Sequence, residues 1–241
     1  MSKLIAHRGA SLLALENTEK AFTLAAENTN VYGIETDVWL TLDNVWVCSH
    51  DSNPFADKNI HIYQANYQDI QALPLIIPKA KYQTLVPSYI CTLDKYLDIC
   101  QNYNKAPIIE LKQPNLTELQ LINLLTKVKT NNLFTSSSFI SFNFSTLDLL
   151  KKIDPQTITY NLIDSKFNQN GLGKRGIIEA INSQCNVSIR AILASQRMID
   201  LIHAHKLLVS IWTVDKQNQG QKYQKRGVDF ITSNEITLLN R

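Results

Sequence analysis

Short apolar runs alternate with segments of helical spacing along most of the chain. The apolar, β-branched runs predict eight main strands, at 3–7, 33–40, 107–112, 138–144, 157–162, 185–190, 207–213 and 228–232. Apolar positions three and four residues apart predict helices between them, at about 17–29, 92–103, 116–130, 145–152, 176–182, 195–206 and 215–226. Strands that alternate with helices indicate a parallel sheet, and eight such units predict an α/β fold that closes as a TIM (β/α)8 barrel.

One region, at about 51–88, breaks this alternation. It shows no clear periodicity and carries prolines at positions 54, 74, 78 and 87. We therefore expect a small insertion after the second strand region, preceded by an extra strand at 45–49 on the rim of the barrel. The insertion either caps a site or packs as a surface loop, and the sequence leaves both possibilities open.

Two carboxylates lie on one face of the predicted strand 33–40. Because side chains alternate along a strand, Glu35 and Asp37 point the same way, with their Cα atoms about 6.6 Å apart. At that separation both carboxylates can reach one cation, and they repel each other without one. A hard divalent metal is the simplest way to relieve the repulsion. The turn at Asp43-Asn44 returns the chain, and strand 45–49 brings His50 near the same end.

Other polar and aromatic side chains lie where predicted strands end. At or just past the carboxyl ends are His7, Glu110, Lys112, Trp212 and Thr232. This is the rim on which barrel enzymes build their active sites. Glu110 and Lys112 share a strand face with Ile108, and His7 shares one with Ile5, so the polar residues extend an apolar lumen at its open end.

Composition and charge narrow the class of protein further. With 44% hydrophobic residues, the chain can form one domain over residues 1–241. The formal charge of +3 favours anionic partners, but lysine and arginine are scattered, so nucleic-acid binding is not expected. The four cysteines form no closely spaced metal-type pair, and neither a secretory signal nor a long apolar run is found. We therefore expect free thiols, a cytoplasmic location and no stable membrane insertion.

The polar motifs occur in an order that is specific when taken together. They are Ile5-Ala6-His7-Arg8-Gly9, Glu16-Asn17-Thr18, Gly33-Ile34-Glu35-Thr36-Asp37-Val38, His50-Asp51, Ile109-Glu110-Leu111-Lys112, Ile211-Trp212-Thr213-Val214 and Gly227-Val228-Asp229-Phe230-Ile231-Thr232. In this order, each at a predicted strand end, they resemble the glycerophosphodiester phosphodiesterase family over almost the whole chain.

The resemblance implies a metal-dependent hydrolase that cleaves a glycerophosphodiester to glycerol 3-phosphate and an alcohol. It implies a divalent cation, Ca²⁺ or Mg²⁺, held by Glu35, Asp37 and Glu110. His7 and His50 resemble the acid and base pair of the family, and the sequence leaves open which histidine plays which role. Histidine suits proton transfer near neutral pH, and oxygen ligands suit a hard metal.

Three further residues are candidates for substrate binding. Arg8 and Lys112 would hold the remaining phosphate oxygens, the first as a fork and the second as a point charge. Either cation could instead pair structurally with the carboxylates. Trp212 would wall the pocket against the glycerol part, or pack as a core residue.

The chain departs from the family pattern at three places. Leu15 stands where the family usually has proline, and residues 52–56 replace the usual Arg-Thr-Thr-Gly-like run after His50-Asp51. The closing strand ends Thr232-Ser233-Asn234 rather than Thr-Asp. These changes concern substrate selection and remove none of the candidate metal ligands or histidines.

Two other functions share some of these residues. A phospholipase-D-like activity on lysophospholipid or sphingolipid would use the same histidines and carboxylates, with an exposed apolar mouth and usually a secreted, disulfide-bonded chain. A catalytically silent barrel that binds phosphorylated ligands is the alternative from another class. The leading expectation is an enzyme that acts on a small soluble diester, and the sequence does not indicate an oligomeric state.

Overall fold

Eight parallel strands form a closed barrel in the computed structural model, which describes residues 1–77, 87–164 and 172–239. The strands are β1 (Lys3–Ala6), β2 (Val31–Leu40), β5 (Ala106–Leu111), β6 (Ser138–Ser141), β7 (Thr159–Ile163), β8 (Asn186–Arg190), β9 (Val209–Trp212) and β10 (Phe230–Ser233). Neighbouring strands pair in parallel, and β1 closes the barrel by pairing with both β10 and β2. Each strand coincides closely with a predicted one, so the predicted TIM barrel is confirmed.

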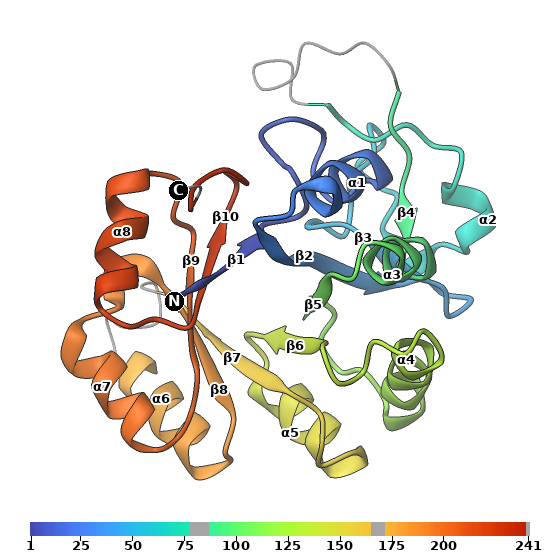
Figure 1. Cartoon of the computed structure of the whole chain (residues 1–241). Helices are drawn as coiled ribbons and strands as arrows, with labels where there is room; N and C mark the ends of the chain where they lie inside the picture. The colour runs from blue at the N-terminus through green and yellow to red at the C-terminus, as the bar shows by residue number, and fades with distance from the viewer. Residues whose placement is uncertain (78–86, 165–171, 240–241) are drawn as a thin grey trace.

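Helices surround the barrel, as Figure 1 shows. They are α1 (Glu19–Glu27), α3 (Leu93–Asn102), α4 (Glu118–Thr130), α5 (Phe144–Ile153), α6 (Leu172–Asn182), α7 (Gln196–Ala204) and α8 (Gln217–Lys225). Threonine side chains start three of them, since Thr18, Thr92 and Thr117 each accept a hydrogen bond from a backbone N–H of the first turn. Within the described ranges, none of the helices combines the length and the apolar character needed to cross a bilayer.

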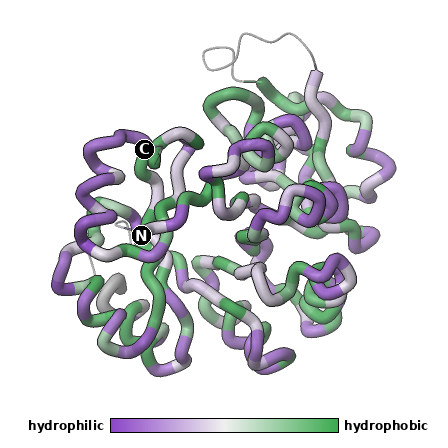
Figure 2. The backbone as a smooth tube through the Cα atoms, in the orientation of Figure 1, coloured by the Kyte–Doolittle hydropathy of each residue, from purple (hydrophilic) through white to green (hydrophobic). Residues whose placement is uncertain are grey.

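Apolar side chains fill two layers of this fold. The larger cluster lies between the strands and the helices and includes Phe22, Tyr96 and Ile109. A smaller cluster occupies the barrel lumen and consists of Ile5, Ala106, Ile108, Ile140, Tyr160 and Leu162. Figure 2 shows apolar character along the central strands and polar character on the outer helices. Because Ile5 and Ile108 lie in the lumen, His7 and Glu110 continue the lumen face toward the strand ends.

The predicted insertion has a small apolar core of its own. β3 (Trp46–Cys48) pairs antiparallel with β2, and β4 (Cys91–Thr92) pairs antiparallel with β3. Between them lie the 3-10 turn η1 (Ile62–Gln64) and the short helix α2 (Tyr67–Ile70). The buried cluster there consists of Val47, Phe55, Ile62, Ile70 and Ile90. Residues 78–86 of the predicted insertion lie outside the described residues.

Gly9 makes the tight turn that follows His7 and Arg8, and its replacement is expected to destabilise the fold. Its φ of +79° is unfavourable for other residues, and an added Cβ would lie 2.6 Å from the carbonyl carbon of Ala21. Gly227 has a similar φ of +83°, with no described atom within 4 Å of an added Cβ. We expect Gly227→Ala to cost about 1 kcal/mol of unfolding free energy and Gly9→Ala roughly 3 kcal/mol.

Urea unfolding of the two variants measures both effects. Because the backbone strain is the same, the difference between the variants reports the steric contact with α1. Equal losses in both variants would contradict the close approach of Gly9 to Ala21.

Candidate active site

Three carboxylates from two neighbouring strands converge at the carboxyl end of the barrel. Glu35 and Asp37 come from β2 and Glu110 from β5, and the strand register sets Asp37 opposite Glu110. One carboxylate oxygen of each lies within 4.8 Å of the other two. All three residues are buried, and Asp37 is completely inaccessible. The three residues that the sequence indicated as metal ligands are therefore brought together.

The three carboxylates share an unfavourable electrostatic environment. Burial, together with the charge of Asp37, raises the pKa of Glu35 well above its ordinary value and that of Glu110 to about 7. Burial also opposes ionisation of Asp37, but Arg8 and Lys112 outweigh it and lower the pKa of Asp37. A cation bound beside them would favour the ionised forms of Glu35 and Glu110.

Two cations already lie against this cluster. Arg8 Nε lies 3.1 Å from Asp37 Oδ2, and Arg8 Nη1 donates to Glu16 Oε1 at 2.8 Å. Lys112 Nζ lies 3.0 Å from Glu110 Oε1 and 3.5 Å from Asp37 Oδ1. Both residues thus make the structural ion pairs that the sequence left open, and both also line one cavity.

The two histidines approach the cluster from different strands. His7 follows β1, and its Nε2 lies 4.0 Å from Glu35 Oε2, while its Nδ1 lies 2.8 Å from Asn234 Oδ1. Burial and the charge of Arg8 lower the pKa of His7, which favours its neutral form. His50 follows β3, and its Nδ1 lies 2.8 Å from Asp51 Oδ1. If each Nδ1 carries the proton and donates it, each Nε2 is free to accept one.

One cavity of about 280 Å³ collects most of these groups. The charged residues and histidines on its wall are His7, Arg8, Glu35, His50, Glu110, Lys112 and Asp164. Phe142, Leu162 and Trp212 form an apolar wall, with Phe142 edge-on to Trp212 at 6.0 Å between ring centroids. Asp37 does not line the cavity itself, but its ion-pair partners Arg8 and Lys112 do. The sequence-predicted candidates are thus gathered at one site.

Sequence reasoning missed the residues that hold these groups in place. Asn17 lies just before α1, and its Nδ2 donates to Asp37 Oδ2 at 2.9 Å while its Oδ1 accepts from Thr36 Oγ1 at 2.9 Å. Asn234 is held by Asp215, since its backbone N–H and its Nδ2 each donate to that carboxylate at 2.8 Å. The only signal in the sequence was that Asn17 lies in a family motif and Asn234 departs from one.

The cluster fits a hard divalent cation. All three donors are carboxylates, which such cations prefer, and the buried Asp37 Oδ1 has no hydrogen-bond donor among the described residues. When all three carboxylates are ionised they outnumber the two protein cations, Arg8 and Lys112, and a bound metal would neutralise the remaining negative charge.

Comparison with known proteins places the chain in a family. The model of the glycerophosphoryl diester phosphodiesterase family matches residues 7–238. The Bacillus subtilis protein YhdW, provisionally named a glycerophosphodiester phosphodiesterase, is 30% identical over 95% of this chain and 93% of its own.

Solved structures share the fold. An Oleispira antarctica phosphodiesterase in complex with the product sn-glycerol-3-phosphate has a TM-score of 0.81 at 22% identity, over 97% of this chain and 93% of its own. A glycerophosphodiester phosphodiesterase from Thermotoga maritima has a TM-score of 0.76 at 21% identity, over 99% of this chain and 96% of its own. Together with the family match over nearly the whole chain, the barrel and its converging carboxylates lead to one conclusion: this chain belongs to the glycerophosphoryl diester phosphodiesterase family and is a phosphoric diester hydrolase.

Proposed function

We propose that the protein hydrolyses glycerophosphodiesters to glycerol 3-phosphate and an alcohol in a metal-dependent reaction. The observation that carries this proposal is the convergence of Glu35, Asp37 and Glu110 beside His7 and His50 at one cavity. Glu35, Asp37 and Glu110 would hold Ca²⁺ or Mg²⁺. When bound, the cation supplies charge stabilisation for the phosphate oxygens as negative charge grows on them.

The histidines divide the proton transfers between them in this proposal. His7 takes the proton from the attacking hydroxyl or water, because its lowered pKa favours the neutral form and Asn234 fixes its Nδ1. His50 gives a proton to the departing alkoxide, with its Nδ1–H donated to Asp51 Oδ1. Both histidines line the wall of one cavity.

Arg8, Lys112 and Trp212 bind and orient the substrate. The guanidinium and the ammonium lie between the carboxylates and the cavity, where they donate to non-bridging phosphate oxygens. Trp212 Nε1 has no hydrogen-bond partner in the described part of the chain, so it is available to a glycerol hydroxyl. The rings of Trp212 and Phe142 pack against the glycerol carbons.

We further propose one domain over residues 1–241, acting on small soluble diesters in the cytoplasm. The four buried cysteines are free thiols, which fits a reducing compartment. They are Cys48, Cys91, Cys100 and Cys185. The proposed reaction supplies glycerol 3-phosphate to glycerol and lipid metabolism.

Release of glycerol 3-phosphate from a panel of glycerophosphodiesters tests the function. Purified protein is assayed after treatment with chelator, and again after Mg²⁺ or Ca²⁺ is restored. We expect release that disappears with chelator and returns with at least one of the two metals. Absence of release from every diester with either metal would overturn the proposal, and lysophospholipid and sphingolipid substrates would then be assayed.

Metal affinity is expected to fall as the pH is lowered through 7. The pKa of Glu110 is about 7 in the metal-free protein, so below that pH a proton must leave before the carboxylate binds metal. For one such proton, binding of Mg²⁺ or Mn²⁺ should be about 25-fold weaker at pH 5.5 than at pH 7.5. Titration calorimetry in two buffers of different ionisation enthalpy measures both the affinity and the protons released. An affinity independent of pH would contradict the raised pKa of Glu110.

A further inference from the structure

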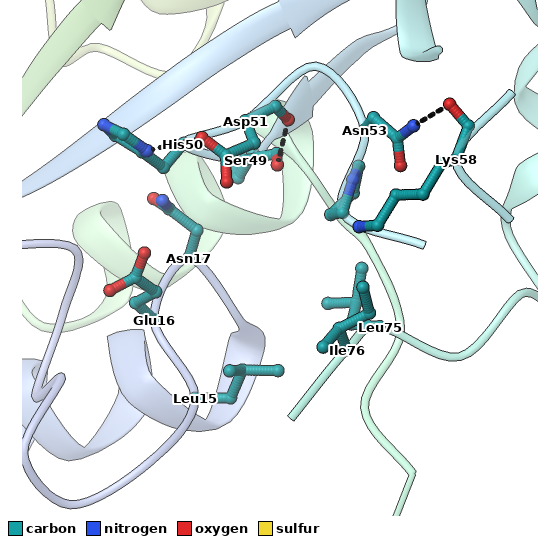
Figure 3. A pocket seen from close by; sticks show the side chains of 12 residues that line it. Leu15, Glu16, Asn17, Ser49, His50, Asp51, Asn53, Lys58, Leu75 and Ile76 are labelled. Carbon is teal, nitrogen blue, oxygen red and sulfur yellow. Dashed lines mark hydrogen bonds and ion pairs between the residues drawn. The ribbon is translucent and has the colours of Figure 1, made fainter. Parts of the chain in front are cut away.

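A second cavity, of about 340 Å³, adjoins the candidate active site on the side of the insertion. We call it the outer cavity and define it by Leu15, Asn53, Lys58 and Ile76 together with His50, which lines both cavities. Figure 3 shows His50, Glu16 and Asn17 on one side and Asn53 and Lys58, from the insertion, on the other. A group bonded to the phosphate and passing His50 therefore enters the outer cavity.

Asn53 offers this cavity a hydrogen-bond acceptor. Its Nδ2 donates to the backbone carbonyl of Lys58, which fixes the amide orientation, because the flipped amide would set two oxygens against each other. Asn53 Oδ1 is then buried and accepts no hydrogen bond from any described residue. A buried acceptor without a donor is unfavourable, so a donor on a ligand would be bound there.

Lys58 offers the same cavity a donor. Its Nζ donates to the backbone carbonyl of Phe55 at 3.3 Å, which uses one of three N–H groups. Figure 3 shows the Lys58 side chain alongside Asn53 on the insertion side. An acceptor and a donor from the insertion thus line one part of the outer cavity.

The carboxylates of the outer cavity already have cationic or N–H partners. Glu16 Oε1 accepts from Arg8 Nη1 at 2.8 Å, and Asp51 Oδ1 lies 2.8 Å from His50 Nδ1. Asp51 is also largely exposed, which weakens its attraction for a charged ligand. An ammonium headgroup would meet the charge of Lys58, and a carboxylate headgroup would meet the lone pairs of Asn53 Oδ1.

We infer that the outer cavity binds the leaving alcohol and selects a neutral polyol, an inference that rests on the proposed function. A hydroxyl group donates to Asn53 Oδ1 and accepts from Lys58 Nζ, which neither an ammonium nor a carboxylate can do. Leu15, Leu75 and Ile76 supply an apolar edge for the carbon skeleton. Leu15 before α1 and Asn53 and Pro54 after His50 thus contribute to this cavity from two separate segments.

The experiment compares kcat/KM for diesters that differ only in the alcohol. Glycerophosphoglycerol and glycerophosphoinositol carry polyols, glycerophosphocholine and glycerophosphoethanolamine carry cations, and the glycerophosphoethyl ester carries no second polar group. We expect the polyol diesters to exceed the cationic ones at least tenfold. The ratio of polyol to ethyl-ester kcat/KM should fall about tenfold in Asn53→Leu and in Lys58→Met, and stay unchanged in the exposed control Lys152→Met.

The possible results distinguish the polyol subsite from the proposed function. A preference for the cationic diesters, or an unchanged ratio in both Asn53→Leu and Lys58→Met, overturns the polyol subsite and leaves the proposed function intact. Hydrolysis of no diester at all overturns both. Lys58→Met keeps the test decisive if Asn53→Leu does not fold, because its Nζ makes only one described bond, at 3.3 Å.

Discussion

Replacing His7 by alanine is expected to lower kcat/KM by about 10³-fold, since a positioned acid or base contributes roughly 10²–10⁴. His7 Nε2 lies 4.0 Å from Glu35 Oε2 while its Nδ1 contacts Asn234, so the variant loses a ring nitrogen that is held in a fixed orientation at the cluster. Stability should change little, because the variant loses a hydrogen bond worth about 1 kcal/mol. Steady-state kinetics and thermal unfolding measure the two effects separately.

The matched control is His205→Ala, at an exposed position after α7. It should keep full activity. His50→Ala should lose activity to a similar extent as His7→Ala if the two act as a pair. Activity of His7→Ala within tenfold of the parent protein would exclude His7 as the acid or base.

Replacing Asp37 by asparagine is expected to abolish metal binding in the millimolar range and activity with it. Asp37 is the one carboxylate of the cluster whose pKa is lowered, so it carries the charge that first attracts a cation. The amide replacement can keep its oxygen toward Arg8 and Asn17, which both lie against Oδ2, but its NH2 group then faces Lys112 Nζ, 3.5 Å from Oδ1. We expect metal affinity to fall at least about 100-fold, since one charged ligand is lost.

Calorimetric titration with Mg²⁺ or Mn²⁺ measures this loss directly, on protein shown to be folded by circular dichroism. Glu110→Gln removes a ligand at the edge of the cluster and serves if Asp37→Asn does not fold. Asp148→Asn, in an exposed ion pair with Lys152, is the control for loss of one negative charge. Unchanged metal affinity in both cluster variants would show that the metal binds elsewhere.

The periodicity of the sequence was sufficient to predict the barrel because each strand is buried on both sides or alternates between two apolar layers. Ile108 faces the lumen and Ile109 the helices, and both are apolar, so the run is easy to recognise. The short elements of the insertion were missed for the opposite reason. β4 and α2 are too short for a period to show, and their stability comes from contacts with Val47 and Ile62 rather than from local propensity.

The candidate site likewise contains residues that the sequence could predict and residues that it could not. Glu35, Asp37 and Glu110 were predictable because parity and strand ends place them on one rim. Their polar neighbours were not, since those contacts join residues far apart in sequence. Asn17 contacts Asp37 across 20 positions and Asn234 contacts His7 across 227, and no local pattern encodes either distance.

The bond between His7 and Asn234 joins the beginning of the barrel to its end. β1 cannot close the barrel until β10 pairs with it, and His7 cannot be oriented until Asn234, held by Asp215, is in place beside it. The orientation of His7 therefore depends on closure of the barrel, whereas the carboxylate cluster depends on the pairing of β2 with β5. A substitution that weakens the pairing of β1 with β10 is expected to disturb His7 while it leaves Glu35, Asp37 and Glu110 together.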